Sequence, residues 1–373
     1  MGELTYMHQV ECSNDPTLQE DLERTVALPI PWDMLNNATV LITGASGLIG
    51  SQMVRTLLAA NRICNCHMRI LAMVRSIEKA NQVFGDLLRR TELEILVADV
   101  TEPICVTCEV DYIFHTASVT ASKEFITHPV EAIEVAVTGT KNVLNFAKEE
   151  KCKSVVYLSS MEVYGTVSST DNHRTAEDEL GYIDLSNVRS CYPEGKRICE
   201  NMCVCYAAQY GTPVKIARMA QTFGAGVSLS DNRVFAQFAK SAMLGENIVL
   251  HTKGGSNGNY CYTADAVAGL LTILLQGKDS EAYNVVSESS TTTIAQMAQM
   301  VSEKITGGKS KVIFDIPNDA LVYGYAPDVK LRLSSKKLEA LGWKPVVAPE
   351  LEMMYKRLIA SFRAQKSASM TLK

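Results

Sequence analysis

A glycine-rich turn is the first feature of this sequence that could do chemistry. Residues 43–50 read TGASGLIG and lie between an apolar, β-branched run at 39–43 and a predicted helix. In this setting Gly44 would permit a tight turn, Gly47 would let backbone N–H groups approach a diphosphate, and Gly50 would let helix and strand pack closely. The turn therefore predicts a dinucleotide-binding site.

Tyr192 and Lys196 form a second feature, a Y-x-x-x-K pattern at the head of a predicted helix over residues 190–210. A spacing of four places both side chains on one helix face. A lysine ammonium and a cationic nicotinamide ring would together favour phenolate over phenol. A tyrosine whose ordinary pKa is about 10 could then act as a base near neutral pH.

A third polar segment, YLSSMEVYG at 157–165, follows the fifth predicted strand. Ligands of parallel α/β sheets bind at the carboxyl ends of the strands. Ser160 and Glu162 are therefore candidates to contact a reacting substrate. The structural alternative is a loop capped by its serine.

Strands and helices alternate along the first 220 residues, which predicts βαβ units and a parallel sheet. The strands read as continuous apolar runs, as expected for strands that are buried on both faces. We predict an α/β fold, with a Rossmann-type doubly wound parallel sheet over residues 38–225. Strands are expected at 39–43, 69–74, 93–98, 110–115, 154–159 and 213–219, and helices at 53–60, 76–88, 129–149 and 190–210.

Two further parts flank this predicted domain. Residues 1–37 form an N-terminal arm, mobile up to residue 16, with a short helix at 18–28 that begins with a Thr17-x-x-Glu20 capping box. Helices separated by short strands predict a smaller C-terminal α/β lobe over residues 226–365, which would bind the substrate. Its helices are expected at 233–244, 264–275, 294–305 and 351–362, and residues 366–373 are expected to form a frayed tail.

Composition excludes several classes of partner. The net charge of −5 argues against nucleic acid or an anionic membrane as the main partner. No apolar run reaches the roughly 18 residues that span a bilayer. Eleven cysteines, an odd number, and a polar N-terminus indicate reduced thiols in a cytoplasmic protein. No metal is expected, because the pairs Cys64/Cys66 and Cys105/Cys108 lack zinc-ribbon spacing or a histidine partner.

In this order, the three motifs resemble the extended short-chain dehydrogenase/reductase superfamily, and more narrowly its NAD-dependent epimerase/dehydratase branch, which acts on nucleotide sugars. The resemblance covers about residues 38–345 and includes the LGW segment at 341–343. It implies that Tyr192 is the catalytic base, that Lys196 binds ribose and lowers the pKa of Tyr192, and that Ser160 bonds the reacting sugar hydroxyl. The residues implied to bind the cofactor are Gly44, Ser46, Gly47, Leu48, Ile49, Gly50, Arg75, Asp99, Val100, Thr116, Ala117, Ser118, Tyr192 and Lys196.

Departures from the family pattern bear on the reaction. Dehydratases of the family carry Asp-Glu after the catalytic hydroxyl, whereas this chain has Met161 and Glu162. Decarboxylases of UDP-glucuronate carry Ser-Glu there and an arginine in a late glycine loop, which aligns with Gly258. Epimerases need only a base, a hydride acceptor and room for the ketone to turn over. The departures favour an NAD(P)-dependent nucleotide-sugar epimerase that reacts at C4, with Glu162 as a further catalytic residue.

Other activities stay open: a nucleotide-sugar 4-ketoreductase, a UDP-glucuronate-type decarboxylase, a 4,6-dehydratase, or a regulatory module that only binds NAD(P). The cofactor is expected to be NADP rather than NAD, because the second predicted strand ends at Arg75, which could pair with a 2′-phosphate, rather than at an acid. The family implies a homodimer through the helices at 129–149 and 190–210. The expected substrate contacts are Ser118, Ser160, Met161, Glu162, Gln221 and Lys330.

Overall fold

The central sheet has seven parallel strands in a computed structural model that describes residues 10–167, 173–316 and 330–371. The strand order is β3-β2-β1-β4-β5-β6-β10, which reverses direction between β1 and β4 and so places a topological switch point at their carboxyl ends. This confirms the predicted Rossmann-type α/β fold. The strands are β1 (Thr39–Thr43), β2 (Arg69–Val74), β3 (Leu93–Val97), β4 (Tyr112–His115), β5 (Ser154–Ser160), β6 (Val214–Met219) and β10 (Ala282–Val285).

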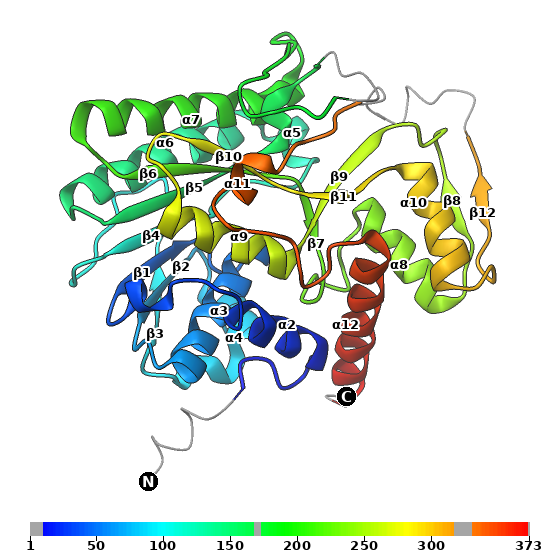
Figure 1. Ribbon diagram of the computed structural model, residues 1–373, viewed down its shortest axis with the longest axis horizontal. Helices are drawn as coiled ribbons and strands as arrows, with labels where there is room; N and C mark the ends of the chain where they lie inside the picture. The colour runs from blue at the N-terminus through cyan, green and yellow to red at the C-terminus, as the bar shows by residue number, and fades with distance from the viewer. Residues whose placement is uncertain (1–9, 168–172, 317–329, 372–373) are drawn as a thin grey trace.

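Helices cover both faces of this sheet (Figure 1). The helices α2, α3 and α9 lie on one face, and α6 and α7 pack together on the other. Side chains alternate accordingly: Val40 and Ile42 of β1 belong to the first core, and Leu41 belongs to the second. The bounds are α2 (Pro16–Val26), α3 (Leu48–Cys64), α4 (Ile77–Phe84), α5 (Glu124–Thr127), α6 (Pro129–Glu149), α7 (Cys191–Tyr210) and α9 (Thr263–Gln276).

The N-terminal arm is more firmly attached than the sequence predicted. Helix α2 is capped by Asp15, whose carboxylate accepts a hydrogen bond from the Leu18 N–H at 3.0 Å, so the expected Thr17 capping box is wrong. Residues 10–15 are not mobile, because Glu11 is buried between Arg62 and Arg90. Residues 1–9 lie outside the described residues.

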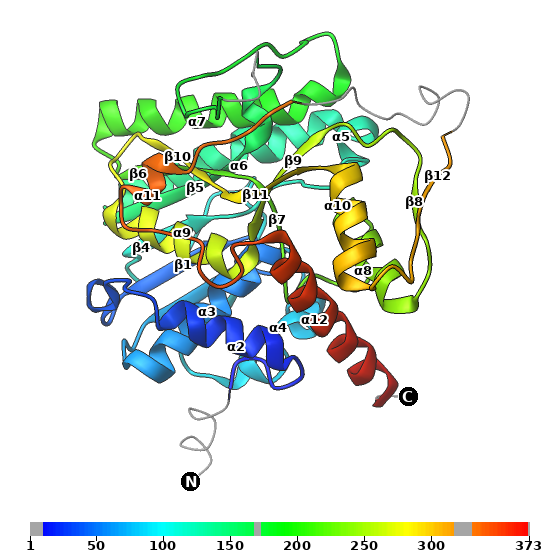
Figure 2. The same ribbon diagram turned by 45° about the vertical axis from the view of Figure 1, so that its right-hand side comes forward.

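The smaller lobe is built around two further sheets (Figure 2). Phe223 lies at the centre of its core and stacks on Phe235, with ring centroids 4.5 Å apart. One sheet contains β7 (Gln221–Phe223), β9 (Asn257–Tyr262) and β11 (Ser287–Thr293), and the other pairs β8 (Ile248–Leu250) with β12 (Val312–Phe314). The helices of this part are α8 (Val234–Leu244), α10 (Ile294–Met300), α11 (Lys336–Glu339) and α12 (Leu351–Thr371).

Two predictions about this region need correction. The chain does not remain in the smaller lobe from 226 to 365, because α9 covers the central sheet and β10 pairs with β6 at its edge. Nearly every residue of α9 is buried, which requires an apolar surface on both sides of that helix. The predicted frayed tail is also wrong up to Thr371, because α12 continues to that residue.

Candidate active site

The glycine turn requires glycine at two of its positions. Gly44 has a φ of +67°, and a Cβ atom there would lie 2.7 Å from the Cα of Ala117. A Cβ atom at Gly50 would lie 2.5 Å from the carbonyl oxygen of Gly44. Helix α3 begins directly after Gly47 with no side-chain cap, so its first N–H groups can bind an anion. These features fit the diphosphate of a dinucleotide.

The carboxyl ends of β1 and β4 are fastened together beside this turn. The Thr43 hydroxyl lies 2.8 Å from Nδ1 of His115, and Thr116 donates a hydrogen bond to the Thr43 carbonyl at 2.6 Å. Burial, helped by the charge of Lys196, lowers the pKa of His115 to about 3. His115 therefore stays uncharged, and its hydrogen bond with Thr43 holds the ends of β1 and β4 together.

Arg75 and Asp99 follow the neighbouring strands β2 and β3. Hydrogen bonds from Thr101, at 2.9 Å from its N–H and 2.8 Å from its hydroxyl, and the nearby charge of Arg75 lower the pKa of the Asp99 carboxyl. Val100 is buried next to it, and its carbonyl accepts a hydrogen bond from Asn142 at 3.0 Å. The residues expected to bind a cofactor at this end of the fold thus follow four adjacent strands.

Tyr192 and Lys196 lie in the first two turns of α7, next to the end of β5. The Tyr192 phenol is hydrogen-bonded to Ser160; burial raises the pKa of Tyr192 to about 12, and this bond lowers it in part. Lys196 is buried, donates a hydrogen bond to the Leu158 carbonyl at 2.7 Å and lies 5.9 Å from the Tyr192 ring centroid. Burial lowers the pKa of Lys196 to about 8.

Phe125 and Arg189 also belong to this site, although neither was among the residues predicted for it. Phe125, on α5, stacks on Tyr192 with ring centroids 4.4 Å apart and 19° between the ring planes. The Arg189 guanidinium lies 5.8 Å from the Phe125 ring centroid. Only the position of Arg189, three residues before Tyr192, could have drawn attention to it.

Glu162 is not free in this arrangement. Its two carboxylate oxygens accept hydrogen bonds from the two terminal nitrogens of Arg189, at 2.8 and 3.1 Å. The pair is partly exposed, and the Glu162 N–H is bonded to the Ser160 hydroxyl at 3.2 Å. Met161 precedes it in the same short 3₁₀ turn, Met161–Tyr164. The predicted catalytic carboxylate therefore lies beside Ser160 and already has a cationic partner.

Of the remaining predicted substrate contacts, Ser118 follows β4, where its hydroxyl donates to the Val119 carbonyl at 3.1 Å, and Gln221 and Lys330 lie in the smaller lobe. Gln221 is exposed at the start of β7. A Cβ atom at Gly258 would lie 2.2 Å from the Tyr260 hydroxyl, so the Tyr260 phenol fills the space in which a longer side chain would begin. Lys330 precedes Leu331, whose carbonyl accepts a hydrogen bond from Asn259 at 2.8 Å. Lys330 therefore lies beside the strand that carries Gly258.

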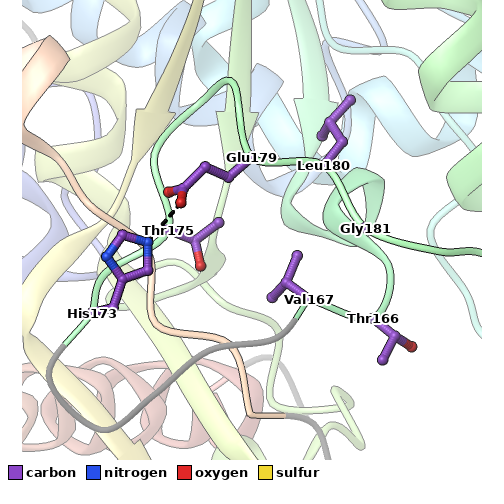
Figure 3. A pocket seen from close by; sticks show the side chains of 7 residues that line it. All are labelled: Thr166, Val167, His173, Thr175, Glu179, Leu180 and Gly181. Atoms are coloured by element: carbon purple, nitrogen blue, oxygen red, sulfur yellow. Dashed lines mark hydrogen bonds and ion pairs between the residues drawn. The ribbon is translucent and has the colours of Figure 1, made fainter.

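A separate cavity of about 270 Å³ lies in the loop after β5 (Figure 3). In it, His173 and Glu179 are 2.7 Å apart, from Nε2 to Oε1. None of the residues predicted for the site lines it. Its lining consists of Thr166, Val167, His173, Thr175, Glu179, Leu180 and Gly181. Within the described part of the chain, no group of acidic, histidine or cysteine side chains could hold a metal ion, and no helix is long and apolar enough to cross a bilayer.

Comparison with known protein families shows the family of this chain. The model of the NAD dependent epimerase/dehydratase family matches residues 40–286. The chain belongs to this family. UDP-glucuronic acid decarboxylase 3 of Arabidopsis thaliana is 30% identical over 312 residues, which are 83% of this chain and 85% of that protein. UDP-glucuronic acid decarboxylase 1 of Xenopus tropicalis is 28% identical over 313 residues, 83% of this chain and 69% of that protein.

Solved structures of other nucleotide-sugar enzymes share the fold. UDP-glucose 4-epimerase from Thermotoga maritima superposes with a TM-score of 0.71 at 20% identity, covering 88% of this chain and 99% of that one. A dTDP-glucose 4,6-dehydratase from Bacillus anthracis, solved with NAD, gives 0.70 at 16% identity, covering 90% and 100%. At such identities the likeness extends to the fold alone.

Proposed function

We propose that this protein is an NAD(P)-dependent nucleotide-sugar epimerase that transiently oxidises its sugar at C4. One observation carries the proposal. Ser160, Tyr192 and Lys196 are assembled at the switch-point edge of the sheet, whereas Glu162, which could divert the ketone to another product, is held on both oxygens by Arg189.

The chain's own residues move the proton in this reaction. Tyr192 takes the proton of the C4 hydroxyl, while the Ser160 hydroxyl orients the reacting oxygen. A bound nicotinamide dinucleotide supplies the hydride acceptor and donor. The same tyrosine returns the proton once the ketone has turned over, and positioned proton transfer of this kind contributes about 10²–10⁴-fold to a rate.

Positive charge must offset the burial of the phenol. Burial raises the pKa of Tyr192 to about 12, and the charge of Arg189 lowers it in part. Lys196 stands 5.9 Å from the ring centroid and adds a second positive charge when protonated. These two cations, together with the positive charge that a bound oxidised nicotinamide ring would add, act against the effect of burial and favour the phenolate.

Decarboxylation of a nucleotide-linked uronic acid is the second candidate. The relatives with 30% identity over most of the chain are UDP-glucuronic acid decarboxylases, and Glu162 is retained as in that branch. Against it, Met161 has no polar group, and the Tyr260 phenol fills the place of the arginine expected at Gly258. A substrate carboxylate would therefore not meet an arginine side chain from position 258, so we place this activity second.

The cofactor, partner and compartment are proposed on narrower grounds. Arg75 follows β2, is exposed, and lies close enough to Asp99 for its charge to lower the pKa of the Asp99 carboxyl. An arginine at this place favours NADP, because its guanidinium can pair with the 2′-phosphate of that dinucleotide. We propose a homodimer through α6 and α7. All eleven cysteines are unpaired, which suits the cytoplasm.

The test is to incubate the purified protein with UDP-, GDP-, CDP- and dTDP-linked sugars, including UDP-glucuronate, and to analyse the products by mass spectrometry and NMR. An epimerase gives a product of unchanged mass and inverted configuration. A product lighter by carbon dioxide would instead establish the decarboxylase. No turnover with a bound dinucleotide would favour a regulatory module.

A further inference from the structure

Three consecutive residues at the end of β5 are each bonded to one of three residues of α7. The Leu158 carbonyl accepts from Lys196, the Ser159 hydroxyl donates to Glu200 at 2.5 Å, and Ser160 is bonded to Tyr192. The three α7 residues are spaced by four, so they share one helix face. Tyr192 and Lys196 each have a role in the proposed chemistry, whereas Glu200 has none.

Glu200 is the centre of a buried polar group. Besides the bond from Ser159, its carboxylate accepts hydrogen bonds from Nε and a terminal nitrogen of Arg218, at 3.0 and 2.7 Å. Arg218, on β6, also donates to the Tyr164 hydroxyl at 3.1 Å and to the Glu177 carbonyl at 2.6 Å. Both Glu200 and Arg218 are less than one-tenth exposed. Such a pair is costly to bury unless its groups are fully bonded, as they are here.

We propose that Glu200 is a positioning residue of the active site, which keeps the Lys196 ammonium charged and in register with β5, and that Arg218 holds Glu200 in place. Lys196 and Glu200 are one turn apart on the face of α7 that meets β5. The proposal rests on the proposed function and on the role that the family resemblance implies for Lys196, binding of the cofactor ribose.

Among the titratable groups around Lys196, Glu200 is the one held in an ion pair with an arginine. The titratable groups that face it are Tyr157 of β5, His115 of β4, and Tyr192, Cys199, Glu200 and Cys203 of α7. Burial keeps His115 neutral and raises the pKa values of Tyr157 and Cys203 well above their ordinary range, so these groups carry no charge. Glu200 is the carboxylate among them, and its charge, after that of Cys199, counters part of the lowering of the Lys196 pKa that burial causes.

The substitution Glu200→Gln removes this charge while keeping the side chain's shape. If the pKa of Lys196 falls by about one unit from its value of about 8, the variant has about fivefold less charged lysine than the wild type at pH 8 and nearly the same amount at pH 6. Titration calorimetry with NAD and NADP should therefore show a ratio of variant to wild-type Kd near one at pH 6 and about fivefold at pH 8.

Glu194→Gln is the matched control, because Glu194 lies on the same helix but pairs with Arg197 at 3.3 Å on a more exposed face. Its Kd ratio should stay near one at both pH values. The double variant Glu200→Gln/Arg218→Met also lacks the anion and leaves no buried arginine without a partner, so it serves if the single variant does not fold. Because it also removes the positive charge of Arg218, its Kd ratio should rise less between pH 6 and pH 8 than that of the single variant.

A Kd ratio that is the same at both pH values would overturn the proposal, since a purely structural role would weaken binding equally. Unchanged binding in a folded Glu200→Gln protein would overturn it as well. If the wild type binds neither NAD nor NADP, the proposed function itself fails, and that outcome is separate from wild-type binding that the substitution leaves unaffected.

Discussion

Arg189 holds both carboxylate oxygens of Glu162, with its two terminal nitrogens at 2.8 and 3.1 Å. The pair lies beside the Tyr192 phenol, and its members act on that group in opposite directions: the charge of Glu162 raises the pKa of Tyr192 and that of Arg189 lowers it. Glu162 is therefore held in an ion pair next to the Tyr192 phenol. This pairing separates the proposed reaction from those that need a free acid at the same place.

Substitution of Glu162 should therefore cost much less than substitution of Tyr192. Tyr192→Phe removes the proposed base, and we expect turnover to fall by about 10²–10⁴-fold while dinucleotide binding is kept. Glu162→Gln should lower turnover by less than about tenfold, because its carboxylate already has a partner. Turnover of a nucleotide sugar by each variant measures this, with Glu179→Gln as a control on another partly exposed acid. Equal losses in Glu162→Gln and Tyr192→Phe would contradict the assignment.

Arg75 should decide between the two dinucleotides. An arginine can pair bidentately with a 2′-phosphate, which only NADP carries. We expect NADP to bind at least tenfold more tightly than NAD, and Arg75→Ala to remove the difference, as measured by titration calorimetry. Lys79→Ala, on the exposed face of the following helix, is the control. Tighter binding of NAD by the wild type would show that Arg75 has another role, such as stacking on adenine.

Glu11 should be a major stabiliser of the N-terminal arm. Its side chain is fully buried and accepts hydrogen bonds from Arg62, at 3.0 and 2.8 Å, and from Arg90 at 2.9 Å. Glu11→Gln removes a buried negative charge that lies between two arginines and should lower the free energy of unfolding by about 3 kcal/mol. Glu23→Gln is the control, because Glu23 is 45% exposed beside the same Arg62 and should cost less than about 1 kcal/mol. Equal stability of the two variants in urea at pH 7 would contradict this.

The stabilisation by Glu11 should also depend on pH. Burial alone would raise the pKa of Glu11, but hydrogen bonds and charges from Arg62, Gln19 and Arg90 lower it overall from 4.5. Because the folded pKa is below the unfolded one, the contribution is fully present above pH 4.5 and is lost as the pH falls through the folded pKa. The difference between wild type and Glu11→Gln should therefore shrink on acidification. A difference that grows as the pH is lowered would reverse this sign.

The outer faces of α6 and α7 should form the interface of a dimer. Exposed apolar side chains lie on both helices, among them Ile133, Ile198 and Val204. Light scattering at micromolar concentration should give twice the mass of the chain, and Val204→Glu should give a monomer. Val249→Glu, on the smaller lobe and similarly exposed, should leave the dimer intact. A wild-type monomer would refute the interface.

The parts of the fold that are local in sequence could be predicted closely. The bounds of β1, β2 and α6 agree with the expected ranges, because continuous apolar runs and a proline at the start of α6 define them. The return of the chain to the main sheet at β10 could not be predicted. That strand has only four residues, and its partner β6 lies more than 60 residues earlier in the chain.

The site shows the same division. The glycine turn and the Tyr192–Lys196 pair could both be recognised, because the spacing of their residues is itself typical of their chemistry. Phe125 reaches Tyr192 from 67 residues away, and the partner of Glu162 lies 27 residues along the chain. Neither contact leaves a periodic pattern. For that reason the sequence identified Glu162 as a catalytic candidate but did not predict its ion pair with Arg189.

The central claim is that hydride leaves C4 of a nucleotide sugar and returns to the same carbon while Tyr192 carries the proton. The most direct measurement uses nucleotide sugars labelled with deuterium at C4, with the products analysed by NMR and mass spectrometry. The account predicts a C4 epimer of unchanged mass that still carries deuterium at C4, and no such product with Tyr192→Phe. A product lighter by carbon dioxide or water, or an epimer whose C4 deuterium has exchanged with solvent, would contradict it.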